Sequence, residues 1–207
     1  MGPRECYNCL LSEKVIGELA KRNISGFYCE TKSDALSKAL ELIPLGCTVS
    51  CGGSATLHEI GLHEALNAGA YHYLDPLAAK GGLEKERIAR EALFADCYLM
   101  SANAISATGE LVNIDGIGNR VAALCFGPKK VIVIAGMNKV EPNLDAAVCR
   151  AKNTAAPLTM LLWKQDYGSF DELTEKAEAA FSQIVVTGMS MKADRILVIL
   201  VGESLGH

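Results

Sequence analysis

Apolar residues along this chain alternate between a helical period and short uninterrupted runs. In residues 31–43 the apolar positions follow the i, i+3, i+4, i+7 spacing of one helical face, and Thr31 is a suitable N-cap for that helix. Four apolar runs have the length of buried strands: CTVSC (47–51), CYLM (97–100), VIVIA (131–135) and ILVILV (196–201). Strands that alternate with helices form βαβ units. We therefore expect an α/β fold with a mostly parallel sheet and helices on both faces.

Capping residues predict where several helices begin. Ser54 is expected at or near the cap of a helix that starts in SATLHEIG, and Pro142 in the first turn of a later helix. Ser169 and Glu172 have the spacing of a capping box. The other expected elements are helices over residues 83–95, 119–126 and 169–184, and two short extended pieces over residues 104–114 around Gly109.

Composition narrows the class of protein. The chain has 207 residues, half of them apolar, and a net charge of −4, so we expect one domain over residues 1–207. Residues 1–10 are expected either to be disordered or to start a short helix. No basic run exceeds two residues, so nucleic-acid binding is not expected. No apolar run approaches the length of a membrane span and no secretory leader is recognisable, so we expect a cytoplasmic protein without membrane contact.

The eight cysteines do not form a metal-binding pattern. Cys6 and Cys9 make one CxxC pair without a second pair to complete a zinc or cluster site, and its role stays open. His58 and His63 stand five residues apart, about 140° around a helix, so they are not expected to share one metal ion. We expect no metal in this chain, and we interpret Cys51 as a buried strand-end cysteine rather than a nucleophile.

Three loops that follow predicted strands could carry chemistry, because ligands of parallel sheets bind at the carboxyl ends of strands. In the first, Gly52 and Gly53 allow a sharp turn, and the hydroxyls of Ser54 and Thr56 could help the backbone to hold a phosphate or carboxylate. The alternative is an ordinary tight turn capped by Ser54.

The second and third loops add charge. Residues 113–120 (NIDGIGNR) combine Asp115 with Arg120, whose planar guanidinium matches an anion; the alternative is a turn with a structural Asp–Arg pair. In residues 136–139 (GMNK), Lys139 would lie at the carboxyl edge of the sheet or would be a solvated surface lysine. Glu59 and Glu110 stand close to these loops and, with Asp115, are the candidate acid–base residues.

Taken together, these segments resemble the LUD-domain (lactate utilization) family. The resemblance rests on GGSATLHEIGLHEAL (52–66), on residues 93–140 with the string GELVNIDGIGNRVAA followed by GPKKVIVIAGMNK, and on LVILVGESLG near the end. It extends over about residues 10–150 and 195–206. The binding-type loops of the family map onto Gly52, Gly53, Ser54, Thr56, Asn103, Asn113, Asp115, Gly116, Gly118, Asn119, Arg120, Asn138 and Lys139.

The resemblance implies a fold like that of the sugar-phosphate isomerase, glucosamine-phosphate deaminase and CoA-transferase group. It also implies an association with oxidation of lactate or related organic acids, in which LUD-domain proteins accompany iron–sulfur oxidoreductase subunits. Relatives of this short type often carry a cysteine-rich segment before the final strand. Residues 150–207 of this chain contain no cysteine, so we expect neither an iron–sulfur cluster nor another cofactor in it.

Three hypotheses about function stay open at this point. In the first, the chain binds a small anionic metabolite as an enzyme or enzyme subunit: Arg120 and Lys139 hold the anion, and Glu59, Glu110 or Asp115 moves protons. In the second, it is a non-catalytic assembly, regulatory or ligand-sensing partner of an iron–sulfur lactate-type oxidoreductase. The third and weakest is a CoA-ester transferase with Glu110 as nucleophile. A homodimer is the expected assembly because two-fold pairs are commonest.

Overall fold

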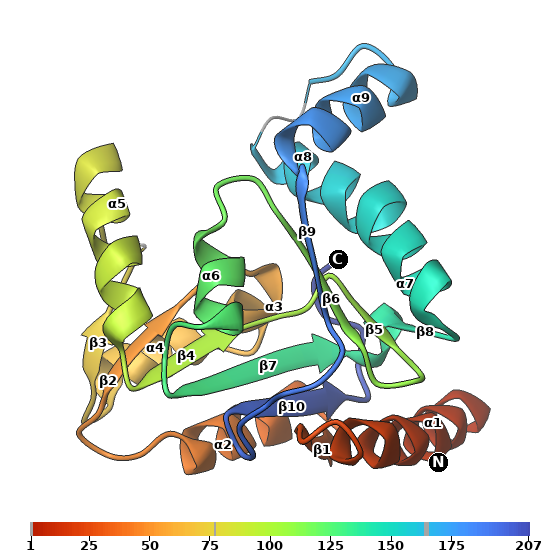
Figure 1. The fold of residues 1–207 in the computed structure, drawn as a ribbon, viewed down its shortest axis with the longest axis horizontal. Coiled ribbons are helices and arrows are strands. Elements are labelled where there is room, and N and C mark those ends of the chain that lie inside the picture. Colours follow the sequence, from red (N-terminus) through yellow and green to blue (C-terminus); the bar gives the residue numbers. More distant parts are fainter. Residues whose placement is uncertain (1, 77, 164–165) are drawn as a thin grey trace.

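The computed structural model describes residues 2–76, 78–163 and 166–207. Its centre is a six-stranded sheet in which every neighbouring pair is parallel (Figure 1). The strands follow the order β1 (Ser25–Cys29), β10 (Ile196–Val201), β7 (Lys130–Gly136), β4 (Cys97–Met100), β2 (Thr48–Cys51) and β3 (His72–Leu74). The predicted parallel α/β fold is therefore confirmed, and all four apolar runs form strands of this sheet.

Helices cover both faces of the central sheet. The side chains of β7 contribute to the hydrophobic core on each face. Val131, Val133 and Ala135 pack toward one face, while Ile132 and Ile134 pack toward the other, because side chains of a strand alternate. The first face is covered by α1 (Pro3–Ala20), η1 (Ala92–Phe94), which follows α5 (Gly82–Glu91), and α6 (Asn119–Cys125). The second face is covered by α2 (Lys32–Leu42), α3 (Ala55–Glu59) and α4 (Leu62–Ala68).

A smaller four-stranded sheet, which the sequence did not predict, forms an additional layer. Its order is β8 (Val140–Glu141), β5 (Ala104–Ser106), β6 (Leu111–Asp115) and β9 (Gln183–Thr187). The antiparallel β5–β6 hairpin turns through Gly109, whose φ of +95° favours glycine. One face of this sheet packs against a group of helices, seen beside it in Figure 1: α7 (Leu144–Arg150), the π-helical turn η3 (Ala151–Ala155), α8 (Ala156–Trp163) and α9 (Phe170–Ala180). The short 3₁₀ turn η2 (Met137–Lys139) connects β7 to β8.

Several caps are confirmed at atomic detail. The side chains of Thr31, Ser54 and Ser169 accept hydrogen bonds from backbone N–H groups in the first turns of α2, α3 and α9. The carboxylate of Glu172 accepts from Gly168 N at 3.1 Å instead of returning to Ser169, so only half of the expected capping box forms.

Two helix boundaries differ from the sequence predictions. Pro142 lies before α7 rather than in its first turn, because Asn143 is the N-cap and accepts from Ala146 N. The helix predicted to extend to residue 184 ends at Ala180, because Ile184 pairs with Ile114 across β9 and β6.

The N-terminal segment is helical over its described part, since α1 begins at Pro3. Asn8 on this helix donates to the carbonyl of Gly202 at 3.0 Å, which ties α1 to the segment after β10. Across the described ranges, no helix combines the length and apolar character that crossing a membrane requires.

Candidate functional site

The candidate site lies at the carboxyl edge of the central sheet, where segments that follow four different strands meet. Because β2, β4, β7 and β10 are parallel, their carboxyl ends point to the same edge (Figure 1). Thr56 comes after β2, Ser101 after β4 and Lys139 after β7. The Nζ atom of Lys139 donates to Thr56 Oγ1 at 2.9 Å and to Ser101 Oγ at 3.0 Å. The first and third predicted loops are therefore in direct contact.

Lys139 is buried, with 3% of its surface exposed, so the alternative of a solvated surface lysine is excluded. Burial lowers the pKa of Lys139 to about 7, and the positive charges of Arg150 and Arg120 act in the same direction, while Glu59 opposes them. Among the ion pairs of the described residues, none joins Lys139 to a carboxylate. This amine is thus held by two hydroxyl groups in cationic surroundings.

Arg120 brings the second loop to the first. A Cβ atom placed on Gly52 would lie 3.1 Å from Arg120 Cδ, so the arginine stem packs directly on the glycine. Its Nη2 donates to Asn103 Oδ1 at 2.9 Å and to the carbonyl of Ile114 at 2.6 Å, and its Nε lies 3.6 Å from Asp115 Oδ2. Arg120 therefore braces the loops against each other, and its side chain retains 16% exposure.

Asp115 and the neighbouring glycines shape the second loop. One oxygen of Asp115, Oδ1, accepts from the backbone N–H groups of Ile117 and Gly118. Gly118 has a φ of +91° and precedes α6, while a Cβ on Gly116 would come within 2.5 Å of the Ala180 carbonyl. Asp115 and both glycines thus hold the turn in shape, which matches the structural alternative for this loop.

The two amide residues near β5 and β6 differ in their partners. Asn103 Oδ1 accepts from Ile114 N as well as from Arg120, so this amide connects the hairpin to the second loop. Asn113 is fully buried in β6, and neither polar atom of its side chain has a hydrogen-bond partner among the described residues. Asn119, the first residue of α6, is half-buried.

The two candidate glutamates have different surroundings. Glu59, on α3, accepts from Gly206 N at 2.9 Å, and its charge acts on Lys139. Glu110 lies at the opposite end of the β5–β6 hairpin from Asn103, bound to Arg22 and Thr108. Since β6 spans the five residues Leu111–Asp115, Glu110 lies about 17 Å along the strand from Asp115. The structure therefore brings Glu59, but not Glu110, to the site.

Two parts of the site were missed by sequence reasoning. Arg150, at the end of α7, donates to the carbonyls of Asn103 and Asn138. The segment after β10 lies over Lys139: the carbonyl of Leu205 accepts from Thr56 Oγ1 at 3.4 Å, and the N–H of Leu205 donates to Asn138 Oδ1 at 3.1 Å. The rule that identified the other loops, a segment following a parallel strand, also applies to residues 202–207.

A second polar cluster lies at the ends of β2 and β3. Cys51 Sγ is 3.1 Å from Tyr73 Oη and 3.8 Å from His63 Nδ1, and the tyrosine and histidine atoms are 2.8 Å apart. Burial raises the pKa of the Cys51 thiol to about 12 and lowers the pKa of His63. A protonated thiol is a poor nucleophile, so this cluster does not favour cysteine catalysis.

The two histidines that the sequence placed five residues apart lie on different helices. His58 is exposed on α3, whereas His63 is buried on α4.

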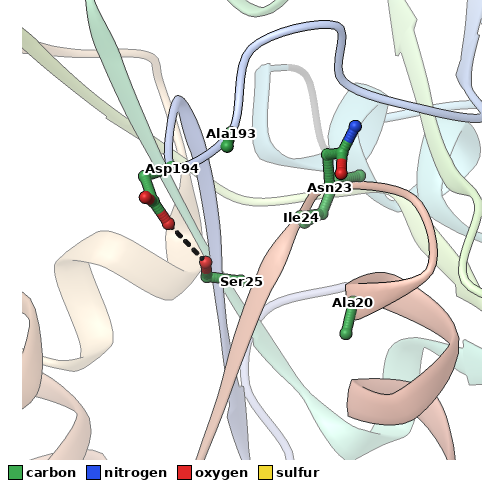
Figure 2. Close-up of a pocket in the computed structure, with 6 residues that line it drawn as sticks. All are labelled: Ala20, Asn23, Ile24, Ser25, Ala193 and Asp194. Atoms are coloured by element: carbon green, nitrogen blue, oxygen red, sulfur yellow. Dashed lines mark hydrogen bonds between the residues drawn. The ribbon is translucent and has the colours of Figure 1, made fainter.

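Two cavities lie outside the site. One, of about 170 Å³, opens at the amino end of β1, where Ser25 donates to Asp194 Oδ1 at 3.0 Å (Figure 2). The other, of about 420 Å³, lies between α9 and the π-helical turn and is lined by Asp171, Glu175 and Glu178 together with Lys152. Acidic groups outnumber basic ones in the lining of both cavities, which disfavours an anion there.

The chain is similar to a known family in sequence and to a solved structure in fold. The family model described as LUD domain matches residues 12–201. A solved DUF162 family protein from Deinococcus radiodurans is similar in fold, with a TM-score of 0.56 at 10% sequence identity, over 94% of this chain and 97% of that chain. A second solved structure, eIF2B delta from Chaetomium thermophilum, has a TM-score of 0.35 at 23% identity, over 54% of this chain and 48% of its own. No curated protein matches the chain.

Proposed function

Because the chain belongs to the LUD-domain family, we propose that it binds a small anionic metabolite at the carboxyl edge of its central sheet, in the utilisation of lactate or related organic acids. The observation that carries this proposal is the buried amine of Lys139, which lies near Arg120 and Arg150 and has no carboxylate partner among the described residues. Three basic side chains meet at the carboxyl edge of the sheet, and within the described ranges carboxylates approach only the two arginines, at 3.6 Å (Asp115) and 3.7 Å (Glu141). Such an excess of positive charge attracts an anion.

The contacts of the segment after β10 support this proposal. Its carbonyl oxygens at Leu205 and Gly206 accept from Thr56 and from Asn138 Nδ2 at 3.4–3.5 Å, which are long hydrogen bonds. A carboxylate is a stronger acceptor than an amide carbonyl. A small carboxylic acid could therefore replace these two carbonyls on the same donors, with Lys139 and the arginines balancing its charge.

Ligand-induced stabilisation tests the proposal. We expect lactate, glycolate, a sugar phosphate or a CoA ester to raise the melting temperature, since a ligand at 100 times its Kd stabilises by about 2.7 kcal/mol. The rise should disappear in Lys139→Met and persist in Lys130→Met, which makes the same substitution at the amino end of β7, the strand that precedes Lys139. If none of these anions stabilises the wild-type protein, the anion site does not exist.

A second candidate function is that of a non-catalytic partner in an iron–sulfur oxidoreductase assembly. It is favoured by Phe94 and Phe126, which are 89% and 90% exposed at the adjoining ends of η1 and α6. Co-purification with the oxidoreductase subunits, abolished by Phe94→Ser with Phe126→Ser, would support it. Dimerisation through the same side chains, measured by light scattering, would instead indicate a homodimer contact. The CoA-transferase hypothesis has no comparable support, because Glu110 is held by Arg22.

A further inference from the structure

We propose that the ε-amino group of Lys139 is a nucleophile that forms an imine with the carbonyl carbon of a 2-oxo acid. This inference rests on the anion-binding function proposed above and specifies both the substrate class and the reacting atom. It follows from the position of the amine, from its partners and from the charges around it.

The first argument is that the structure favours an amine with a free lone pair. Lys139 Nζ donates to Thr56 and Ser101, both neutral acceptors, so no carboxylate among the described residues fixes it as an ammonium. A lysine that is desolvated beside other cations is a recognised form of activated nucleophile. With its pKa lowered to about 7, a substantial fraction of the Lys139 side chains is uncharged at neutral pH, whereas an ordinary lysine is almost fully protonated.

The second argument concerns the class of substrate. An amine attacks an electrophilic carbon. Arg120 and Arg150 meet at Asn103, and Arg150 also donates to the carbonyl of Asn138, the neighbour of Lys139. Their carboxylate partners lie no closer than 3.6 Å, so both guanidinium groups provide charge for an anionic group close to that carbon. A 2-oxo acid has its carboxylate bonded directly to the carbonyl carbon. The carboxylate would lie against the guanidinium groups of Arg120 and Arg150 while the carbonyl carbon faces Lys139 Nζ.

The covalent step is balanced by the groups already in contact with the amine. The Nζ lone pair forms a bond to the carbonyl carbon, and the carbonyl oxygen takes up the proton that nitrogen releases, relayed through the hydroxyl of Thr56 or Ser101. The carbinolamine then loses water and leaves a C=N bond. The net change is amine plus ketone to imine plus water, with no oxidation or reduction.

The third argument is that the amine lies directly beneath the backbone of the segment after β10. A Cβ placed on Gly206 would lie 3.0 Å from Lys139 Nζ and 2.5 Å from Thr56 Oγ1, so the backbone of this glycine lies directly over the reactive atom. The carbonyls of Leu205 and Gly206 accept long hydrogen bonds from Thr56 and Asn138, whereas their N–H groups donate to Asn138 Oδ1 at 3.1 Å and to Glu59 at 2.9 Å. Access of a substrate of a few atoms to the amine therefore requires a local displacement of Gly206, with the Leu205 side chain staying in the core.

Groups from four elements face the amine and set how imine formation depends on pH. Glu59 on α3 favours the ammonium, whereas Arg120 on α6 and Arg150 on α7 disfavour it. The fourth is His207, whose pKa is lowered by burial and by the charge of Lys139. We expect the rate of imine formation to rise as the pH increases through about 7 and then to level off.

Reductive trapping tests the inference directly. The full chain is incubated with pyruvate and sodium cyanoborohydride, and the product is analysed by intact mass and peptide mapping. We expect one added carboxyethyl group, located on Lys139, absent in Lys139→Met and retained in Lys130→Met. Equal labelling of exposed lysines such as Lys129, or no adduct on Lys139, would overturn the inference. A melting curve of Lys139→Met shows whether the variant is folded, and Lys139→Ala provides a second variant.

A binding measurement separates this inference from the proposed function. Lactate carries the carboxylate without the carbonyl, so it can bind the anion site but cannot form an imine. If lactate stabilises the wild-type protein and pyruvate leaves no adduct, the imine is excluded and the anion site stands. If lactate and pyruvate neither stabilise the protein nor label it, both proposals are wrong.

Discussion

Arg22, whose side chain is 25% exposed, and Lys139, which is buried, bind different kinds of partner. Arg22 donates to the carbonyls of Thr108 and Gly188 at 2.9 and 2.6 Å and forms an ion pair with Glu110. Lys139 is more deeply buried, yet it has only two hydroxyl partners and no carboxylate among the described residues. The first arrangement compensates the charge, and the second leaves it uncompensated.

The titration behaviour of the two regions reflects this difference. Burial by itself would raise the pKa of Glu110, but hydrogen bonds from Thr108 and Ser106 and the charge of Arg22 outweigh burial and hold the pKa below its usual value. Burial lowers the pKa of Lys139, and no acidic partner restores it. A compensated pair stabilises the fold, whereas an uncompensated amine is available for binding or reaction.

The largest loss of stability at neutral pH is expected when the ion pair between Arg22 and Glu110 is broken. Arg22→Ala removes three hydrogen bonds and leaves Glu110, whose side chain is 14% exposed, without its cation, so we expect a loss of about 3 kcal/mol in the free energy of unfolding by urea. Lys21→Ala is the control, because Lys21 is 70% exposed and should change stability by less than about 0.5 kcal/mol. Equal stability of the two variants would show that the hydrogen bonds and the ion pair of Arg22 contribute nothing to the free energy of unfolding.

The second prediction concerns the pH dependence of stability in Lys139→Met. The pKa of Lys139 is about 7 in the folded chain, against a usual value of 10.5, so between these values the unfolded chain binds more protons. Stability of the wild type relative to Lys139→Met should therefore rise with pH in this window, by at most about 1.4 kcal/mol per pH unit, and stay constant below it. Urea unfolding of both proteins at several pH values measures the difference. If the difference in the free energy of unfolding between the two proteins does not change with pH, the pKa of Lys139 is the same in the folded and unfolded chains and the amine is charged at neutral pH.

A third prediction tests the cover over the amine. Gly206→Ala places a methyl group against Thr56 Oγ1 at a φ of +57°, so we expect a loss of about 2 kcal/mol and greater solvent access to Lys139. Gly46→Ala is the matched control: its φ is +72° and nothing lies within 4 Å of its Cβ position, so about 1 kcal/mol is expected from the backbone alone. Amide hydrogen exchange at residues 203–207 should increase in the first variant and not in the second.

The smallest effect is expected from Glu59→Gln. The amide oxygen can still accept the Gly206 N–H, but the negative charge that favours the ammonium of Lys139 is lost. The pKa of Lys139 should fall further, so the pH midpoint of pyruvate trapping should shift to lower values while stability changes little. A midpoint that shifts upward would contradict the proposed electrostatic role of Glu59.

Local patterns predicted most of the central sheet because the relevant signal is contained within each segment. VIVIA is apolar on both faces, and Thr31 and Ser54 cap their helices through residues three positions away. The strand β9 was missed because Ile184 continues the helical spacing of Ala180 and Phe181. Its pairing with β6, about 70 residues earlier, decides the conformation.

The candidate site was predicted in part. The positions of Thr56 and Lys139 at one edge follow from the parallel fold, since each stands after a strand of the central sheet. Arg120 follows β6 of the smaller sheet, so its packing against Gly52 is decided by how the two sheets meet. The roles of Arg150 and of Leu205 and Gly206 did not follow, because nothing near them in the chain marks them as neighbours of Lys139. Glu110 could not be distinguished from Glu59, since the partner that holds it, Arg22, lies 88 positions away.

The sequence by itself determined the class of fold and the edge of the sheet at which chemistry can occur, because hydrophobic spacing and strand direction are properties of short segments. Only the tertiary structure decided which charges are compensated. The two partners of Lys139 lie 83 and 38 positions away in the chain, and its burial depends on a segment from the far end of the molecule. Desolvation and charge pairing depend on what surrounds a group in space, and no local pattern encodes that.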